Sequence, residues 1–302
     1  MLNKTCGWLG QTLSRCLWAA CVTAVVFAGA VQAQEIEARL YSNAPINYNF
    51  LGVGFTQVTT NKFQLNTEVL AYNRTFDFFG QSGKVNLIVP YAQLHGHTTT
   101  GSQVISGSSV GLTDPIIRLA TNLYGAPALT VEEFKNYQQD LIIGASLLVS
   151  APLGQYDDSR IVNISNHRWS FKPEVGVSQA LGPWTLELQA AATFFTDTTD
   201  FYGGNTRSQD PIYSLQGHAI YGFRSGVWSS FDVTYFNGGR TTINGALGDD
   251  LQQNWRVGAT LAVPVDIHNS IKFYASSGVA ARTGNNFDMV GIAWQYRWGA
   301  GL

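Results

Sequence analysis

His218 and Ser214 come nearest to the spacing of a nucleophilic site, because they stand four residues apart on one face of a predicted strand. A serine nucleophile needs an imidazole within hydrogen-bond reach and a third group that orients the imidazole. The strand pattern described below assigns this face to the inside of a closed sheet. The other histidines fall in predicted loops and turns: His95, His97, His167 and His268. We therefore predict no catalytic residues.

The sequence offers even fewer candidate residues for binding a metal ion or a cofactor. The sequence holds no HExxH motif and no glycine-rich phosphate loop. All three cysteines, Cys6, Cys16 and Cys21, precede residue 34. We predict neither a metal site nor a cofactor.

The polar side chains of greater interest alternate with apolar ones. Residues 290–298 read V-G-I-A-W-Q-Y-R-W, with large apolar side chains on one face and small or polar ones on the other. The pattern recurs in twelve segments: 51–59, 66–76, 84–94, 114–123, 141–151, 169–179, 184–194, 212–223, 228–236, 254–263, 270–278 and 290–298. For the second and fifth segments either face could point outward. A lipid-facing exterior and a polar interior produce this alternation in membrane barrels.

Composition fits the same architecture. Only 13% of the residues are charged and 31 are glycine, and no second apolar run of helix length follows the N-terminus. Strands can cross a bilayer only as a closed barrel, because every backbone N–H and C=O group in lipid needs a partner. The sequence therefore predicts an all-β protein, a transmembrane antiparallel β-barrel of about 12 strands over residues 50–298.

The connections alternate in length, as short periplasmic turns and longer external loops do in such barrels. Residues 79–83, 181–183, 224–226 and 264–269 form short links, whereas 95–111, 152–168, 195–211 and 237–253 form long polar loops. The link 124–140, between the fourth and fifth strands, is the exception. Its Thr130-x-x-Glu133 motif predicts a capping box and one short helix through Phe134 and Tyr137, in the periplasm or against the barrel mouth.

The N-terminus predicts export. Lys4 and Arg15 precede an apolar stretch over residues 17–30, and residues 31–33 supply small side chains for cleavage. We expect residues 1–33 to be a cleaved signal peptide, 34–49 a periplasmic or lumen segment that could fold inward, and 299–302 a C-terminal tail. The mature chain then has four more acidic than basic residues and no basic patch for nucleic acid.

Alternation places one set of polar side chains inside the barrel: Lys84, Arg118, Lys172, Glu174, Glu187, Gln189, Gln216, His218, Asp232, Arg256, Lys272, Gln295 and Arg297. They are expected either to pair with one another as internal structure or to line a solute path. The basic members would favour anions such as phenolates or aromatic carboxylates. On the second interpretation, neutralising Arg256 and Lys272 reduces anion preference.

Aromatic side chains near the strand ends form a second set, predicted to face outward as girdles at the two membrane interfaces. Its members are Tyr91, Trp169, Trp184, Trp228, Trp255, Tyr296 and Trp298.

Several longer stretches carry a family resemblance. They include E-A-R-L-Y-S-N-A-P at 37–45, A-P-L-G-Q-Y-D at 151–157, N-H-R-W-S-F-K-P-E-V-G-V-S at 166–178 and Q-D-P-I-Y-S-L-Q-G-H at 209–218. From residue 37 to residue 298 the chain resembles the bacterial family of MetA-pathway of phenol degradation proteins, which are labelled transporters. The resemblance implies an outer-membrane barrel linked to the handling of phenol-type aromatics.

Together these observations predict a channel of the bacterial outer membrane for passive uptake of small aromatic or hydrophobic molecules, rather than an enzyme. Its expected partners are outer-membrane lipids and lipopolysaccharide, the barrel-assembly machinery and a small-molecule solute, with no nucleic acid. Two alternatives remain, a non-conducting structural or sensing barrel and an outer-membrane lipid hydrolase.

Overall fold

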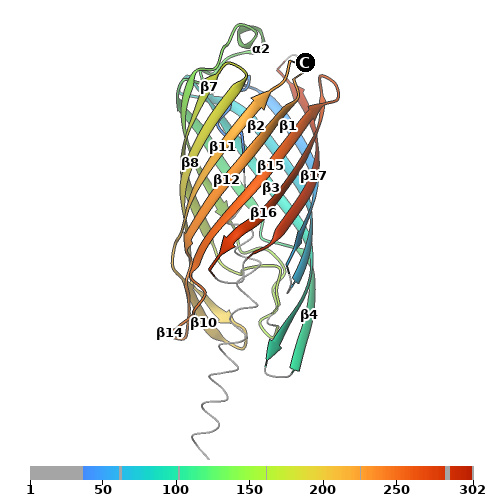
Figure 1. The fold of residues 1–302 in the computed structure, drawn as a ribbon, viewed down its shortest axis with the longest axis vertical. Coiled ribbons are helices and arrows are strands. Elements are labelled where there is room, and N and C mark those ends of the chain that lie inside the picture. Colours follow the sequence, from blue (N-terminus) through green and yellow to red (C-terminus); the bar gives the residue numbers. More distant parts are fainter. Residues whose placement is uncertain are drawn as a thin grey trace, which may run out of the picture.

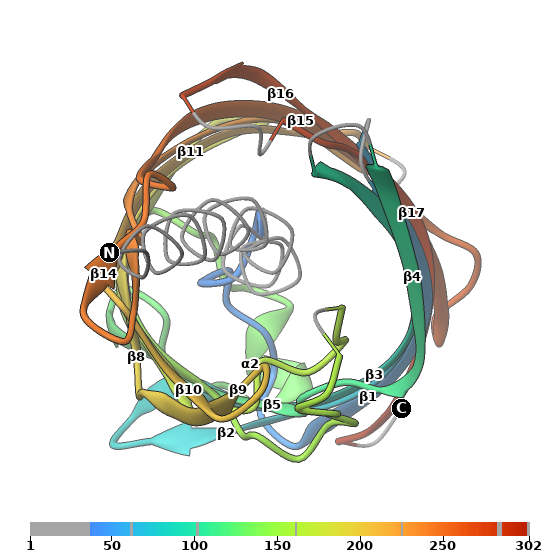
Figure 2. The same ribbon diagram turned by 90° about the horizontal axis from the view of Figure 1, so that it is seen from below.

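Twelve strands close into a barrel in the computed structural model, which describes residues 37–60, 63–100, 103–160, 162–224, 226–282 and 286–300 (Figures 1 and 2). The wall strands are β1 (Tyr48–Thr59), β2 (Phe63–Phe78), β3 (Gln81–Thr100), β5 (Ile116–Tyr124), β6 (Leu141–Ser150), β7 (Ser170–Leu181), β8 (Trp184–Phe195), β11 (Ile212–Gly222), β12 (Trp228–Gly238), β15 (Gln252–Pro264), β16 (Asn269–Ala281) and β17 (Asp288–Gly299). The expected signal peptide lies outside the described residues.

Closure is made by the first and last strands. β1 pairs antiparallel with β17, so that Leu51 stands opposite Tyr296, and each remaining wall strand pairs antiparallel with its neighbours around the ring. A closed ring leaves no unpaired strand edge in the wall, as a bilayer requires. The predicted antiparallel barrel of twelve strands is confirmed.

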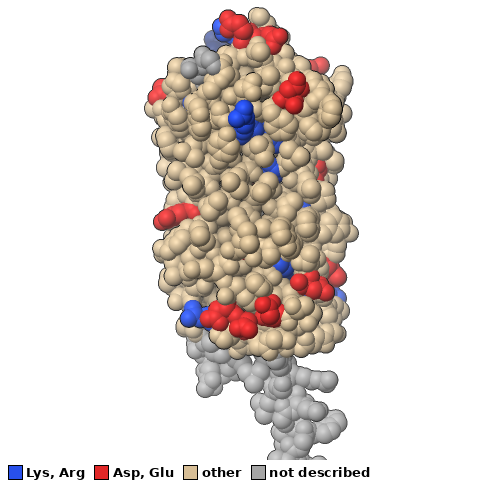
Figure 3. All heavy atoms as spheres, turned by 180° about the vertical axis from the view of Figure 1, so that it is seen from behind, with Lys and Arg blue, Asp and Glu red and all other residues tan. Residues whose placement is uncertain are grey.

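The wall shows the alternation that the sequence predicts. Most outward side chains are apolar, although Glu68 of β2 also faces outward, and Figure 3 shows a wall with few charged atoms between two charged rims. For β2 and β6, whose facing the sequence left open, the structure shows which side chains point outward. Leu70 of β2 faces outward, and in β6 Ile143 and Leu147 face outward while Gly144 and Ser146 face the lumen.

One end of the barrel, at the top of Figure 1, carries short turns and the link between β5 and β6. We call it the turn end, and the opposite end the loop end. Phe79 and Gly80 both have positive φ and join β2 to β3 in a two-residue turn. Helix α2 (Val131–Phe134) begins at the predicted capping box of Thr130 and Glu133, which is confirmed, although the helix ends at Phe134.

The link from β5 to β6 lies against the barrel mouth. The Ser82 N–H donates to the Ala126 carbonyl at 2.9 Å, and the Ala128 N–H donates to the Gly80 carbonyl at 3.0 Å. These bonds join the link to the turn between β2 and β3, so one side of the turn end is covered.

At the loop end, three segments predicted as loops contain strands, and the prediction is wrong there. β4 (Gln103–Leu112) pairs with β3 as a long hairpin, and β9 (Thr198–Phe201), β10 (Asn205–Gln209), β13 (Thr241–Ile243) and β14 (Ala246–Leu247) form a separate four-stranded sheet. β9, β10 and β13 are short and rich in Ser, Thr and Asn. They lack the apolar face that identifies a strand in the sequence.

Candidate functional site: the barrel lumen

An N-terminal segment, residues 37–47, runs inside the barrel along β5 to β8 and is the blue segment in Figure 2. The ring of Tyr41 packs against Gly144 of β6 and Gly176 of β7, which stand opposite each other in register. A Cβ at either glycine would lie 2.2 Å from a ring carbon, so both positions require glycine. The Tyr41 hydroxyl donates to Glu174 Oε1 at 3.0 Å. This fit fixes the segment against the wall.

Two basic side chains predicted to lie in the lumen also hold the segment. Lys84 Nζ donates to the Leu40 carbonyl at 2.8 Å and to the Ser42 carbonyl at 2.7 Å. Arg118, which is buried, forms an ion pair with Glu37. Both cations therefore have partners in the segment, and their role here is structural.

Acidic and amide side chains on the same wall complete the contact. Glu187 Oε2 accepts from the Arg39 N–H at 2.8 Å, and Gln189 Nε2 donates to the Glu37 carbonyl at 3.2 Å. Lys172 lies 3.4 Å from Glu174 within the wall. We call the inner faces of β5 to β8, with residues 37–47, the docked half of the lumen.

The opposite wall has a different inner surface. Several inward residues in the middle of β1, β2 and β17 are small: Gly52, Gly54, Ala71 and Ala293. Gly291 is also inward, but the ring of Tyr274 on β16 lies against it. Lys272 and Gln295 also face inward, yet both side chains are solvent-exposed. Both residues lie near the turn end of β16 and β17, so this wall is accessible from the turn end. We call the inner faces of β16, β17, β1 and β2 the open half.

Two further basic residues on this side have defined contacts. Arg297 Nε donates to the Ile267 carbonyl at 2.6 Å, which ties β17 to the turn before β16. Lys272 Nζ lies 5.4 Å from the ring centroid of Tyr274 on the same strand. Among the inward cations described so far, Lys272 is therefore the one most accessible to a solute.

Arg256 was expected to line the same path, but it is buried. Its Nη1 donates to the Phe287 carbonyl at 3.0 Å and its Nη2 to Ser276 Oγ at 2.7 Å. The guanidinium also lies 3.5 Å from the ring centroid of Phe287. Arg256 therefore holds the link between β16 and β17 against the wall.

The inner face of β8, β11 and β12 carries the last of the predicted lumen residues. Gln216 stands opposite Gln189, and His218 Nδ1 lies 2.7 Å from Asp232 Oδ1. Ser230 Oγ donates to the other oxygen of Asp232 at 3.0 Å. The serine thus binds the carboxylate and not the imidazole, which is not the order of a hydrolase triad.

Six of the seven predicted girdle residues alternate to the outside of the wall: Tyr91, Trp169, Trp184, Trp255, Tyr296 and Trp298. Trp184 contacts Tyr221 at 4.9 Å between ring centroids. For Trp228 the outward prediction is wrong. It shares the inward face of β12 with Asp232, and the Arg39 guanidinium lies 5.3 Å from its ring centroid. Because alternation is strict, counting back from Asp232 would have placed Trp228 inside.

An apolar cluster inside the loop end was missed by the sequence reasoning. Inward residues of β1, β2 and β3 pack there with Ile164 from the link between β6 and β7 and with Phe287: Val58, Phe63, Leu65, Ala92 and Leu94. The available signal was the run of inward apolar residues at the ends of these strands. The cluster therefore covers the loop end of the open half itself, on β1 and β2, and extends onto β3.

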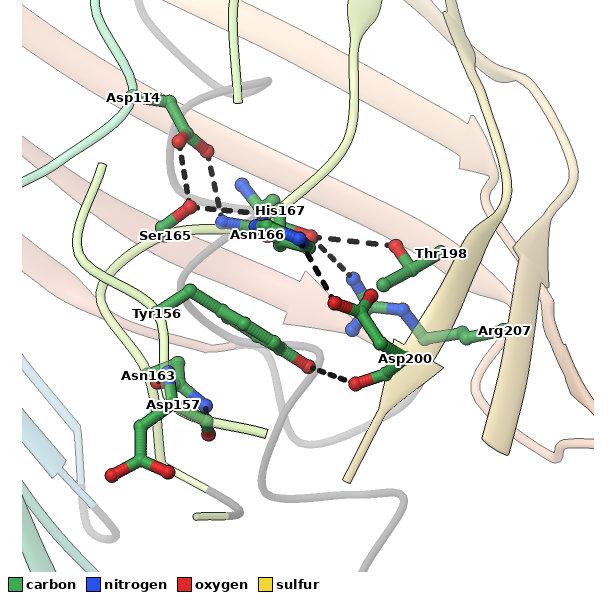
Figure 4. Close-up of polar contacts among 10 residues, drawn as sticks. All are labelled: Asp114, Tyr156, Asp157, Asn163, Ser165, Asn166, His167, Thr198, Asp200 and Arg207. Carbon is green, nitrogen blue, oxygen red and sulfur yellow. Dashed lines mark hydrogen bonds and ion pairs between the residues drawn. The ribbon is translucent and has the colours of Figure 1, made fainter. Parts of the chain in front are cut away.

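Beside this cluster, the link between β6 and β7 forms a polar network (Figure 4). Asp114 accepts from Ser165 Oγ at 2.6 Å and from the Asn166 N–H at 2.8 Å. Burial raises the pKa of the Asp114 carboxyl, and these bonds oppose the change. His167 lies 3.1 Å from Asp200 Oδ2, so the link is fastened to the loop-end sheet.

No group of three or more His, Cys, Asp or Glu side chains in the described part of the chain is arranged to hold a metal ion. Among the described residues no helix is both long and apolar enough to cross a membrane.

A closed wall of twelve antiparallel strands, apolar outside and polar inside, defines an outer-membrane β-barrel. The family model described as "Putative MetA-pathway of phenol degradation" matches residues 49–296, and the chain belongs to this family.

Solved structures share the fold. An outer membrane channel from Pseudomonas putida F1 has a TM-score of 0.76 at 18% identity, covering 87% of this chain and 100% of that one. The transport unit of the autotransporter AIDA-I from Escherichia coli has a TM-score of 0.52 at 9% identity, covering 92% and 98%. No curated protein sequence matches the chain.

Proposed function

We propose that this protein is a channel of the bacterial outer membrane through which small aromatic or hydrophobic molecules diffuse passively. The observation that carries the proposal is the exposure of Lys272 and Gln295 on the inner wall beside small residues. Exposed inward side chains indicate space inside the barrel that a small solute could enter from the turn end.

The class of solute is supported by two features. The family description names phenol degradation, and the solved barrel from P. putida is described as an outer membrane channel. The inward apolar cluster at the loop end, with Phe63 and Phe287, offers a surface on which an aromatic ring can rest next to the polar lumen. A weakly polar ring suits this combination better than a strongly hydrated ion does.

The expected surroundings follow from the outer wall. We propose that lipids and lipopolysaccharide contact the apolar wall and its rims, and that the barrel-assembly machinery inserts the chain. The outward aromatic side chains would lie at the two interfaces, as in other barrels.

Two measurements test the proposal. In planar bilayers, the purified protein should give discrete openings whose conductance rises with salt concentration. Cells that contain it should take up or grow on dilute aromatic compounds faster than cells that lack it. An electrically silent protein with no effect on uptake across a panel of aromatic compounds contradicts the proposal.

A non-conducting barrel is the second candidate, and the docked segment favours it. Residues 37–47 occupy part of the lumen and bind the wall through Tyr41, Lys84 and Arg118. If the segment closed the lumen fully, the bilayer recordings would stay silent. A lipid hydrolase is less well supported, since neither Ser214 nor Ser230 bonds His218 Nε2, which has no hydrogen-bond partner among the described residues.

A further inference from the structure

Two arginines at the loop end play no part in the docked segment or in the open half described above. Arg168 lies two residues before β7, in line with its inward face, and Arg207 lies on the inward face of β10. Each side chain is only 4% exposed. They belong to the same corner of the loop end, since Arg168 Nη2 donates to Gln209, two residues beyond Arg207.

Each guanidinium lies over an aromatic ring. The Arg168 guanidinium carbon is 4.3 Å from the ring centroid of Phe195, and that of Arg207 is 4.7 Å from the ring centroid of Phe201. The acceptors they have are neutral. Arg168 bonds the Gln209 amide, and Arg207 Nη2 bonds the Asn166 carbonyl at 3.4 Å.

Several of their N–H donors are unused. Nε and Nη1 of Arg168 and Nε of Arg207 are buried and have no acceptor in the described part of the chain. Burial lowers the pKa of Arg168 well below its usual value, with the charge of Arg207 as a further cause. Burial likewise lowers the pKa of Arg207 to about 10. A buried cation that no carboxylate contacts directly is costly, and an anion bound by both guanidinium groups would reduce the cost.

The carboxylates around this corner are already engaged. Asp114 accepts three hydrogen bonds from the link between β6 and β7, Asp200 is paired with His167, and Asp250 accepts from the N–H and the hydroxyl of Thr241. Neither Arg168 nor Arg207 forms an ion pair within the described residues. Asp114 and Asp197 lie near enough to Arg168, and Asp250 near enough to Arg207, to offset part of the fall in each pKa, but none of them bonds a guanidinium directly. The unused N–H donors are therefore open to a carboxylate from outside the chain.

We propose that Arg168 and Arg207 form a binding site for small aromatic carboxylates at the loop end of the lumen. A guanidinium binds a carboxylate through two parallel N–H donors, and a carboxylate would displace the neutral Gln209 amide. The rings of Phe195 and Phe201 lie against the two guanidinium groups. Tyr156, stacked on His167 at 4.4 Å, lies in the same network as Arg207 (Figure 4). This inference names a substrate class and rests on the proposed channel function.

The test is calorimetric titration of the full protein in detergent with benzoate, which reports binding whether or not the barrel conducts. The double variant Arg168→Gln with Arg207→Gln should bind benzoate at least tenfold more weakly, since each charge-assisted bond contributes about 1.5 kcal/mol or more. Arg160→Gln is the matched control, because Arg160 lies in the same link but is exposed and paired with Asp157 at 3.0 Å. It should bind as the unaltered protein does.

The variants Arg168→Lys and Arg207→Lys keep the charge but lose the planar fork, and should bind with intermediate strength. Heat-dependent migration in gel electrophoresis confirms that each variant is folded. Equal benzoate affinity in the double glutamine variant would overturn the site. So would equal affinity for uncharged benzyl alcohol, while equal affinity for phosphate would overturn the aromatic assignment. Benzoate binding by a protein silent in bilayers would leave the site standing and contradict the channel.

Discussion

The two halves of the lumen differ in what their inward side chains contact. In the docked half, Lys84 and Arg118 bind the N-terminal segment and Lys172 pairs with Glu174. In the open half, small residues alternate along β1 and β17, and Lys272 and Gln295 remain exposed. An inward charge in a barrel is thus not by itself evidence of a solute path. What matters is whether the charged side chain is buried in the wall or exposed to the lumen.

Removing most of the N-terminal segment that lies in the lumen should have the largest effect on single-channel conductance. Deletion of residues 37–43 takes away the partners of Lys84, Arg118 and Glu187 while keeping the bonds of Ile46 and Asn47 at the start of β1. The docked half should then become a second accessible wall, and single-channel conductance should rise severalfold. Unchanged conductance in a folded deletion variant would show that the segment does not narrow the path.

A smaller change in the slot that Gly144 and Gly176 form for the Tyr41 ring should also raise conductance. Gly176→Val puts side-chain atoms where the Tyr41 ring lies and should displace the segment without deleting it. The control is Gly217→Val on the outer wall, whose Cβ would approach nothing more closely than the Glu187 carbonyl oxygen at 4.0 Å. We expect more frequent or larger openings for Gly176→Val alone. Equal recordings from both variants would contradict the role of the slot.

Substitutions of Lys272 and of Arg256 should have smaller effects, and the two effects should differ in kind. Lys272→Gln should lower anion preference in reversal-potential measurements, because Lys272 is exposed to the lumen. Arg256→Gln should change ion selectivity little. It should instead lower the free energy of unfolding by about 1–3 kcal/mol, because the Phe287 carbonyl and Ser276 lose their donors. The reverse result would place Arg256 on the path and Lys272 off it.

Much of the fold could be predicted from the sequence. Strict alternation and turn length identified all twelve wall strands, since a lipid exterior and a wet interior act on every residue of the wall. The short strands at the loop end were not identified, because β10 and β13 carry no apolar face. The capping box at Thr130 was local and was predicted correctly.

The contacts inside the lumen were harder to predict from the sequence, for a physical reason. The sequence placed Arg118, Lys172 and Arg256 inside the barrel, but facing does not reveal partners that are distant in the chain. Glu37 is far from Arg118 in sequence, and Phe287 is far from Arg256. Gly144 and Gly176 gave no sign that together they receive Tyr41, because two separate strands and a third segment must meet to make that slot.

The most direct test of the account fills the open half. Ala293 on β17 faces the lumen opposite Gly54, whereas Ala275 on β16 faces outward. Single-channel conductance should fall by more than half in Ala293→Phe and stay unchanged in Ala275→Phe. Equal conductance in the two variants would mean that solutes and ions do not pass along β1 and β17, and that the open half is not the path.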